Sequence, residues 1–172
     1  LCIFFFAESA HAAVFAKYDG VDGESKDANH DKWIDVLSID WGSHKPGGGA
    51  TGQSRRRGGV IVEDVTLTIE YEKASPQLEL AALQGVPTPN VIVEFTTPCG
   101  SDGRQVAYLK YELKNVQITS FHVSGSGQSE EVPVEDFALN FEEIKVTYQP
   151  FDDKCQPGQT YGYDWKVEKG AK

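Results

Sequence analysis

The sequence predicts a mainly β protein: an antiparallel β-barrel of two packed sheets, with one short flanking α-helix at about residues 75–84 and a long extended loop at 42–59. Three observations predict this fold. Apolar and polar residues alternate with a period of two over most of the 172 residues, as expected for half-buried strands. Turn-forming clusters of glycine, proline and serine recur between these stretches. The alternation also slips within several strands, which indicates the bends of a closed or nearly closed barrel.

In the N-terminal half, we expect strands at 14–18, 34–41 and 60–72. The apolar phase slips by one residue between Val36 and Leu37, which predicts a bulge or burial on both faces. A polar, acidic loop separates the first two strands. The glycine-rich loop at 42–59 follows the second strand, and a structureless loop of this length is often functional.

A single helix is expected to start at Ser75-Pro76. Serine suits the N-cap because its hydroxyl accepts from a free N–H, and proline suits the first helical position. Gly85 can take the left-handed conformation that ends a helix. A helix of about ten residues is unstable alone, so its apolar side chains should dock on the barrel. These side chains are Leu78, Leu80, Ala81, Ala82 and Leu83.

The C-terminal half predicts strands at 91–96, 105–123, 134–148 and 161–167. The 105–123 stretch is either a strand pair or one bent strand, because its phase switches at Val116. A second switch falls across Glu142-Glu143. Residues 98–103 form a hairpin-type turn, and no internal repeat or linker divides the chain.

The composition excludes several classes of partner. A formal net charge of −10 and a pI of about 4.8 argue against a nucleic-acid partner, which needs a basic face. No stretch reaches the length of about 20 apolar residues that spans a bilayer. The one basic run, Arg55-Arg56-Arg57, is interpreted as a solvated or subunit-contacting loop rather than an anion site.

The N-terminus and the cysteines leave alternatives open. Residues 1–13 are either an N-terminal extension or a signal-peptide remnant, because a short apolar run precedes the small residues around His11. Residues 14–172 are predicted to form a single domain. Of Cys2, Cys99 and Cys155, the last two are expected to be unpaired thiols in turns, with a Cys99–Cys155 disulfide as the alternative in an oxidising compartment.

No pattern of residues supports catalysis. The histidines and cysteines lack the spacing of a zinc site, and neither a nucleophile elbow nor a phosphate-binding loop occurs. We therefore expect no catalytic residue, no cofactor and no metal. The alternative to a structural subunit is a soluble ligand- or carbohydrate-binding β-barrel that uses exposed tryptophans.

One segment carries a family resemblance. Its residues are Asp19, Gly20, Gly23, Glu24, Ser25 and Asp27, followed by His30, by Ile34-Asp35-Val36 and by Trp41-Gly42. In this order they resemble the hemolysin-coregulated protein (Hcp) family, and Ser75-Pro76, Leu139-Asn140-Phe141 and Gly162-Tyr163-Asp164-Trp165 are similar to later parts of its sequence.

The resemblance implies a tube subunit of the type VI secretion system without catalytic residues. It implies homo-hexameric rings that stack into a tube inside a contractile sheath, carry effector proteins in the lumen and are expelled beneath a spike protein. Such a protein is secreted by the type VI system after cytoplasmic assembly. Within this frame, the loop with Gly47, Gly48, Gly49, Arg55, Arg56 and Arg57 is the candidate for ring stacking or for clasping a neighbour.

Overall fold

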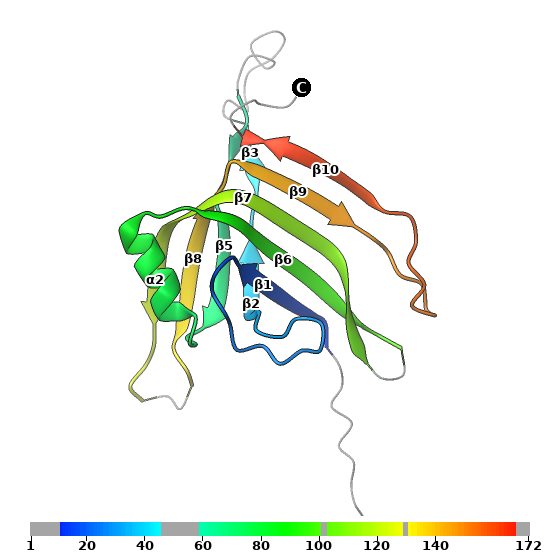
Figure 1. The fold of residues 1–172 in the computed structure, drawn as a ribbon, viewed down its shortest axis with the longest axis horizontal. Helices are drawn as coiled ribbons and strands as arrows, with labels where there is room; N and C mark the ends of the chain where they lie inside the picture. Colours follow the sequence, from blue (N-terminus) through cyan, green and yellow to red (C-terminus); the bar gives the residue numbers. More distant parts are fainter. Residues whose placement is uncertain (1–10, 46–58, 101–102, 129–130, 168–172) are drawn as a thin grey trace, which may run out of the picture.

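The computed structural model describes residues 11–45, 59–100, 103–128 and 131–167, which form one curled antiparallel sheet of eight strands, a small two-stranded sheet and a helix (Figure 1). The predicted mainly β fold is confirmed. The helix is α2 (Ser75–Gln84). The longer strands are β1 (Ala13–Tyr18), β2 (Ile34–Asp40), β5 (Val65–Glu70), β6 (Thr88–Cys99), β7 (Arg104–Ser124), β8 (Val134–Asn140), β9 (Glu143–Tyr148) and β10 (Tyr161–Lys166).

The long strand β7 closes the barrel. The strand order is β10-β9-β7-β6-β1-β2-β5-β8, and β7 also pairs with β8. The first part of β7 pairs with β6 and β9, whereas residues 117–124 pair with β8. A register shift between Ile118 and Ser120 allows the turn from one partner to the other. Of the two interpretations of 105–123, one bent strand is therefore correct.

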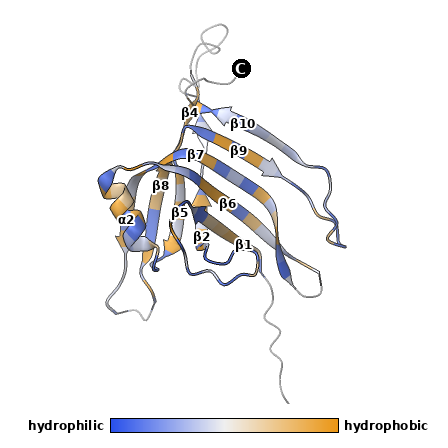
Figure 2. Cartoon of the chain, in the orientation of Figure 1, coloured by the Kyte–Doolittle hydropathy of each residue, from blue (hydrophilic) through white to orange (hydrophobic). Residues whose placement is uncertain are grey.

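The barrel interior is packed with side chains. Alternate residues of β5, Val65, Leu67 and Ile69, point inward and are buried, while the threonines between them are partly exposed. Figure 2 shows the same alternation of apolar and polar residues along β6 and β7. A small cavity lined by Leu67, Ile69 and other core side chains measures about 20 Å³, room for about one water molecule. The interior therefore holds a hydrophobic core rather than a ligand site.

Strands β9 and β10 extend the sheet beyond the barrel as a two-stranded flap. β9 pairs with residues 109–114 of β7, and β10 pairs with β9 in a continuous six-residue register. The flap and α2 lie on opposite sides of the barrel in Figure 1. Of the described strands, only β9 pairs with β10, so the far edge of β10 is open.

The helix has the predicted span, but its N-cap differs. Ser75 lies inside the first turn, and Ala74 takes the cap position without a side-chain hydrogen bond. The Ser75 hydroxyl instead accepts a hydrogen bond from the N–H of Glu72 at 3.0 Å, so it stabilises the turn that leads into the helix. Gly85 adopts the predicted left-handed cap. The predicted docking stripe is only partly correct, because Leu78 is buried whereas Leu80 and Leu83 are exposed.

Several strand boundaries also differ from the prediction. The expected strand at 60–72 is two strands, β4 (Ile61–Val62) and β5. β4 pairs with β3 (Ser43–His44), so the start of the predicted 42–59 loop and the residues just after the loop form a short ribbon. The 134–148 stretch is likewise divided into β8 and β9, at the phase switch that the sequence shows. The predicted bulge in β2 is confirmed by a register shift between Val36 and Ser38.

The expectation of unpaired thiols is wrong for two of the cysteines. Cys99 and Cys155 form a disulfide with a Cα–Cα distance of 5.7 Å. They lie 56 residues apart in the sequence. The alternation of apolar and polar residues does not indicate that the β9–β10 loop folds back to the end of β6. Sheet order, rather than local sequence, brings the two residues together.

Candidate functional site

Most residues of the family motif, from Asp19 to His30, lie in the loop between β1 and β2, whereas Ile34-Asp35-Val36 belong to β2 and Trp41 follows it. Gly20 has φ +80°, a conformation that favours glycine. Gly23 donates its N–H to the Lys32 carbonyl at 2.8 Å, and a Cβ at this position would lie 2.2 Å from the carbonyl oxygen of Trp33. Ser25 is buried and its N–H donates to the Trp33 carbonyl at 2.9 Å. The motif thus specifies a tightly folded loop.

His30 fixes this loop to the barrel. Its imidazole is 2 % exposed, and its ring stacks on Phe15 of β1 with a centroid separation of 4.2 Å. Nδ1 lies 2.6 Å from Oδ1 of Asp27, and Nε2 lies 2.9 Å from Oε2 of Glu94 on β6. The ring can donate to both carboxylates only when both nitrogens carry protons. With its polar atoms paired and its faces covered, His30 is placed as a structural brace.

A second set of contacts links the motif loop to the start of α2. The Glu24 N–H donates to Oε2 of Glu72 at 2.7 Å, and the Lys73 N–H donates to Oε1 of Glu24 at 3.2 Å. Burial raises the pKa of Glu72, the hydrogen bond from the Glu24 N–H opposes this rise, and the Glu24 carboxylate adds to it. Asp19 accepts at its carbonyl from the Thr88 hydroxyl at 3.4 Å. These contacts hold the loop between two neighbouring elements.

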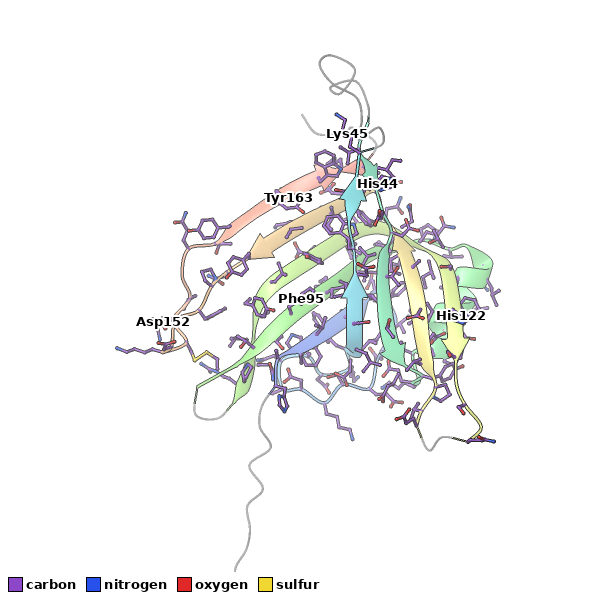
Figure 3. All side chains as sticks on the ribbon, turned by 180° about the vertical axis from the view of Figure 1, so that it is seen from behind. His44, Lys45, Phe95, His122, Asp152 and Tyr163 are labelled. Atoms are coloured by element: carbon purple, nitrogen blue, oxygen red, sulfur yellow. A yellow bond between two sulfur atoms is a disulfide. The ribbon has the colours of Figure 1, made fainter. Side chains whose placement is uncertain are left out.

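Trp41 stands at the base of the β3–β4 ribbon. Its indole N–H donates to the Glu63 carbonyl at 3.1 Å, and its ring meets Tyr111 and Phe141 edge to face. Figure 3 shows His44 and Lys45 at the end of the ribbon, away from the body of the barrel. The predicted loop residues Gly47, Gly48, Gly49, Arg55, Arg56 and Arg57 lie outside the described residues.

The open edge of β10 is the first candidate contact surface. Tyr161 and Tyr163 are 55 % and 50 % exposed, although burial raises the pKa of Tyr163. Gly162 between them lets β9 approach closely, because a Cβ there would lie 2.4 Å from the Val146 carbonyl oxygen. An exposed strand edge with aromatic side chains offers unpaired backbone groups to another chain.

The outer face of α2 is the second candidate surface. Leu80 and Leu83 are 52 % and 75 % exposed, and they lie three residues apart on one face of the helix. Val86, just beyond the helix, is also exposed. We call these three residues the helix patch. Sequence reasoning missed it, because it assigned both leucines to the docked side.

Within the described part of the chain, no group of three or more His, Cys, Asp or Glu side chains is arranged to hold a metal ion. The acidic residues of the motif loop instead face cations or backbone donors: Asp22 lies 3.2 Å from Lys17 and 3.6 Å from Lys32. None of the helices described is long and apolar enough to cross a membrane. The arrangement is that of a scaffold with outward-facing contact surfaces.

Comparison with known proteins agrees with this arrangement. The family model described as "Type VI secretion system effector, Hcp" matches residues 15–148. "Protein hcp1" of Pseudomonas aeruginosa is 32 % identical over 159 residues, which cover 92 % of this chain and 96 % of that protein. The solved "Structure of a type six secretion system protein" has a TM-score of 0.82 at 28 % identity, covering 92 % of this chain and 98 % of that one. Hcp1 from Salmonella typhimurium gives 0.73 at 26 % identity, with 93 % and 97 % covered.

Proposed function

Because this chain belongs to the Hcp family and is a tube subunit of a type VI secretion system, we propose that six copies close into a ring and that the rings stack into a tube with effector proteins in its lumen. The subunit acts by assembly and has no catalytic role. Its partners are further copies of itself, the contractile sheath, the spike protein and the effector cargo.

The observation that carries this proposal is the placement of two unlike surfaces on opposite sides of one subunit. The open edge of β10 lies on one side and the helix patch on the other (Figures 1 and 3). A contact between different surfaces is head-to-tail, and such contacts generate closed rings when the rotation between copies closes. A second copy of this chain is therefore the occupant of each surface.

The β3–β4 ribbon supports stacking along the tube axis. It extends from the body of the barrel, and its first strand, β3, lies within the predicted contact loop at 42–59. Ring closure leaves this ribbon free to meet a subunit of the next ring. The proposal keeps the stacking role for Gly47 to Gly49 and for Arg55 to Arg57, whose side chains can pair with acidic surface on a chain of net charge −10.

Secretion by the type VI system, which family membership establishes, accounts for export. We further propose that assembly precedes export and takes place in the cytoplasm. The interpretation of residues 1–13 as a signal-peptide remnant gains no support from the comparisons. At the start of the described chain, the His11 carbonyl accepts from the Gln105 side chain at 2.9 Å, and the Ala13 carbonyl accepts from the Thr96 hydroxyl at 3.1 Å.

The alternative, a ligand-binding barrel, is disfavoured by the filled interior. The cavity in the core is too small for a sugar ring, and the indole N–H of Trp41 donates to the Glu63 carbonyl. A hollow lined by Lys17, Asp19, Asn90, Ile92, Glu112 and Lys114 has a volume of about 270 Å³, but three of its charged groups are already paired: Lys17 with Asp22, Glu112 with Lys110 and Lys114 with Glu143.

A substitution on the helix patch tests the ring. Leu83→Lys should leave the fold intact, because the side chain is 75 % exposed, and should convert hexamers into monomers in light scattering after size exclusion. Leu37→Lys is the matched control, since Leu37 is 55 % exposed but lies on β2. If the Leu83→Lys variant still forms hexamers, or if the control variant dissociates equally, the helix patch is not part of the ring contact.

Cross-linking tests the head-to-tail arrangement directly. A photoreactive side chain at position 83 is expected to attach to residues 161–166 of another copy, read by mass spectrometry of cross-linked peptides. Attachment to α2 of another copy would indicate a symmetric pair and would contradict a ring of this design.

A further inference from the structure

Cys99 and Cys155 join the barrel to the outer end of the flap. Cys99 is the last residue of β6, and Cys155 lies in the loop 149–160 that connects β9 to β10. Figure 3 shows the disulfide next to Asp152, at the end of the loop that faces the β6–β7 hairpin. The bond is thus a covalent link between two elements that are 56 residues apart.

The loop around Cys155 has its own internal hydrogen bonds. Oδ1 of Asp152 accepts from the N–H groups of Lys154 and Gln156 at 2.9 and 2.8 Å. The Gly158 N–H donates to the Pro150 carbonyl at 2.7 Å. These bonds lie within the loop itself, so the disulfide is not the loop's only source of local structure. What the disulfide determines is where this preformed loop is held relative to the barrel.

The backbone attachment of the flap to the barrel ends well before Cys155. The ladder between β7 and β9 runs to the Leu109–Tyr148 pair, and the Gln149 N–H adds one bond to the Tyr108 carbonyl at 2.8 Å. β10 is joined to the barrel through β9, and most of its residues are exposed. The flap therefore has little buried surface to fix its outer end, and the disulfide supplies the missing constraint.

We propose that Cys99 and Cys155 form a thiol–disulfide exchange site whose oxidation orders the flap and strengthens the contact that β10 makes with the next subunit. This inference rests on the proposed ring, in which β10 is a contact edge. An edge held in its bound conformation loses less conformational entropy on association, so oxidised subunits associate more tightly than reduced ones.

The exchange reaction balances with a small-molecule disulfide, such as oxidised glutathione, as the oxidant. Cys155 is more exposed than buried Cys99, so its thiolate attacks first. A mixed disulfide forms at Cys155 and one small thiolate leaves. The Cys99 thiolate then attacks Sγ of Cys155 and releases the second. The protein loses two protons and two electrons, and the oxidant becomes two thiols.

Thiol counting in the full chain tests the site. After treatment with oxidised glutathione, denaturation and alkylation without reductant, the 172-residue chain should carry one label, on Cys2. After reduction it should carry three. Three labels on the oxidised protein would overturn the proposal.

Sedimentation velocity tests the effect on assembly. Reduction with a phosphine should raise the concentration at which hexamers dissociate by roughly tenfold. Hexamers of the Cys99→Ser/Cys155→Ser variant should dissociate at the same concentration as those of the reduced protein, and reductant should not change that concentration. The Cys2→Ser variant should respond to reductant as the native chain does. Equal association of oxidised and reduced protein would overturn the proposal.

Hydrogen exchange separates this inference from the proposed ring. Reduction should speed exchange in residues 149–166 and leave β1 and β5 unchanged, whether or not rings form. Unchanged exchange in the flap would overturn the redox inference. If no hexamer forms in either state while flap exchange still responds, the ring proposal fails and the ordering of the flap by the disulfide stands.

Discussion

His30 and Glu94 are 64 residues apart in the sequence, yet Nε2 of His30 lies 2.9 Å from Oε2 of Glu94. The contact joins the loop between β1 and β2 to β6, the strand that pairs with the other edge of β1. Lys110 on β7 lies 3.6 Å from the other oxygen of the same carboxylate. One glutamate thus links the motif loop to the part of the sheet that carries the flap.

Replacing His30 should lower the stability of the folded protein. His30→Ala removes the partner of two poorly exposed carboxylates and the stacking on Phe15, so we expect a loss of about 2–3 kcal/mol in the free energy of unfolding. Urea titration followed by tryptophan fluorescence measures it. His122→Ala is the control, because His122 is exposed on β7, and it should change stability by less than about 0.5 kcal/mol. A similar value for both variants would contradict the bracing role.

Two glycines of the motif loop should differ in their tolerance of alanine. Gly23→Ala places a methyl group against the Trp33 carbonyl and should cost about 3 kcal/mol, the upper end for an overpacked site. Gly20→Ala meets no atom within 4 Å, but keeps φ at +80°, so about 1 kcal/mol is expected. Thermal melts of the two variants show which substitution lowers the melting temperature more. A milder effect at Gly23 than at Gly20 would contradict the close approach of the backbone at Trp33.

Glu135 should make stability depend on pH. It lies on β8, fully buried, and among the described residues its carboxylate oxygens have no hydrogen-bond partner. Burial raises its pKa to about 7; the nearby Ser75 hydroxyl opposes this, and Glu79 on α2 adds to it. The ordinary value is 4.5, so the folded state holds a proton that the unfolded state releases, and stability falls as pH rises from 4.5 to about 7.

Glu135→Gln tests this pH dependence. The amide mimics the protonated acid, so the variant should be more stable than the native chain at pH 8, by an amount on the order of 1–3 kcal/mol, and similar to it at pH 4.5. Chemical unfolding across this range supplies the comparison. Parallel curves for the two proteins would show that another group is responsible.

The contact loop should matter for tube growth more than for folding. Deleting Ala50 to Arg57 leaves β3 and β4 in place, so the melting temperature and the ring should persist while stacking weakens. Electron microscopy of rings and tubes, with light scattering for growth, measures the effect. If the deletion variant forms tubes of native length, the loop is not needed for stacking.

Particular elements show how far the sequence could be read. The span of α2, at about residues 75–84, could be predicted because proline near the start of a helix and glycine after its end act on their own backbone. The bulge at Val36 was also readable, since a phase slip is local. The helix patch could not be predicted, because the pattern of leucines does not indicate which side of the helix packs against the barrel. The disulfide was only the alternative prediction for a related reason: its two residues meet only through the sheet order.

The sequence alone determined the strand-rich fold, the position of the helix and the motif that marks the family. These features depend on a period of two, on end residues of the helix and on the order of the motif residues, all of which are short-range. Only the tertiary structure decided that β7 closes the barrel, that the flap leaves β10 with an open edge, and that Cys99 meets Cys155. Such pairings join residues distant in the chain, and the free energy that selects among them comes from packing the whole core at once.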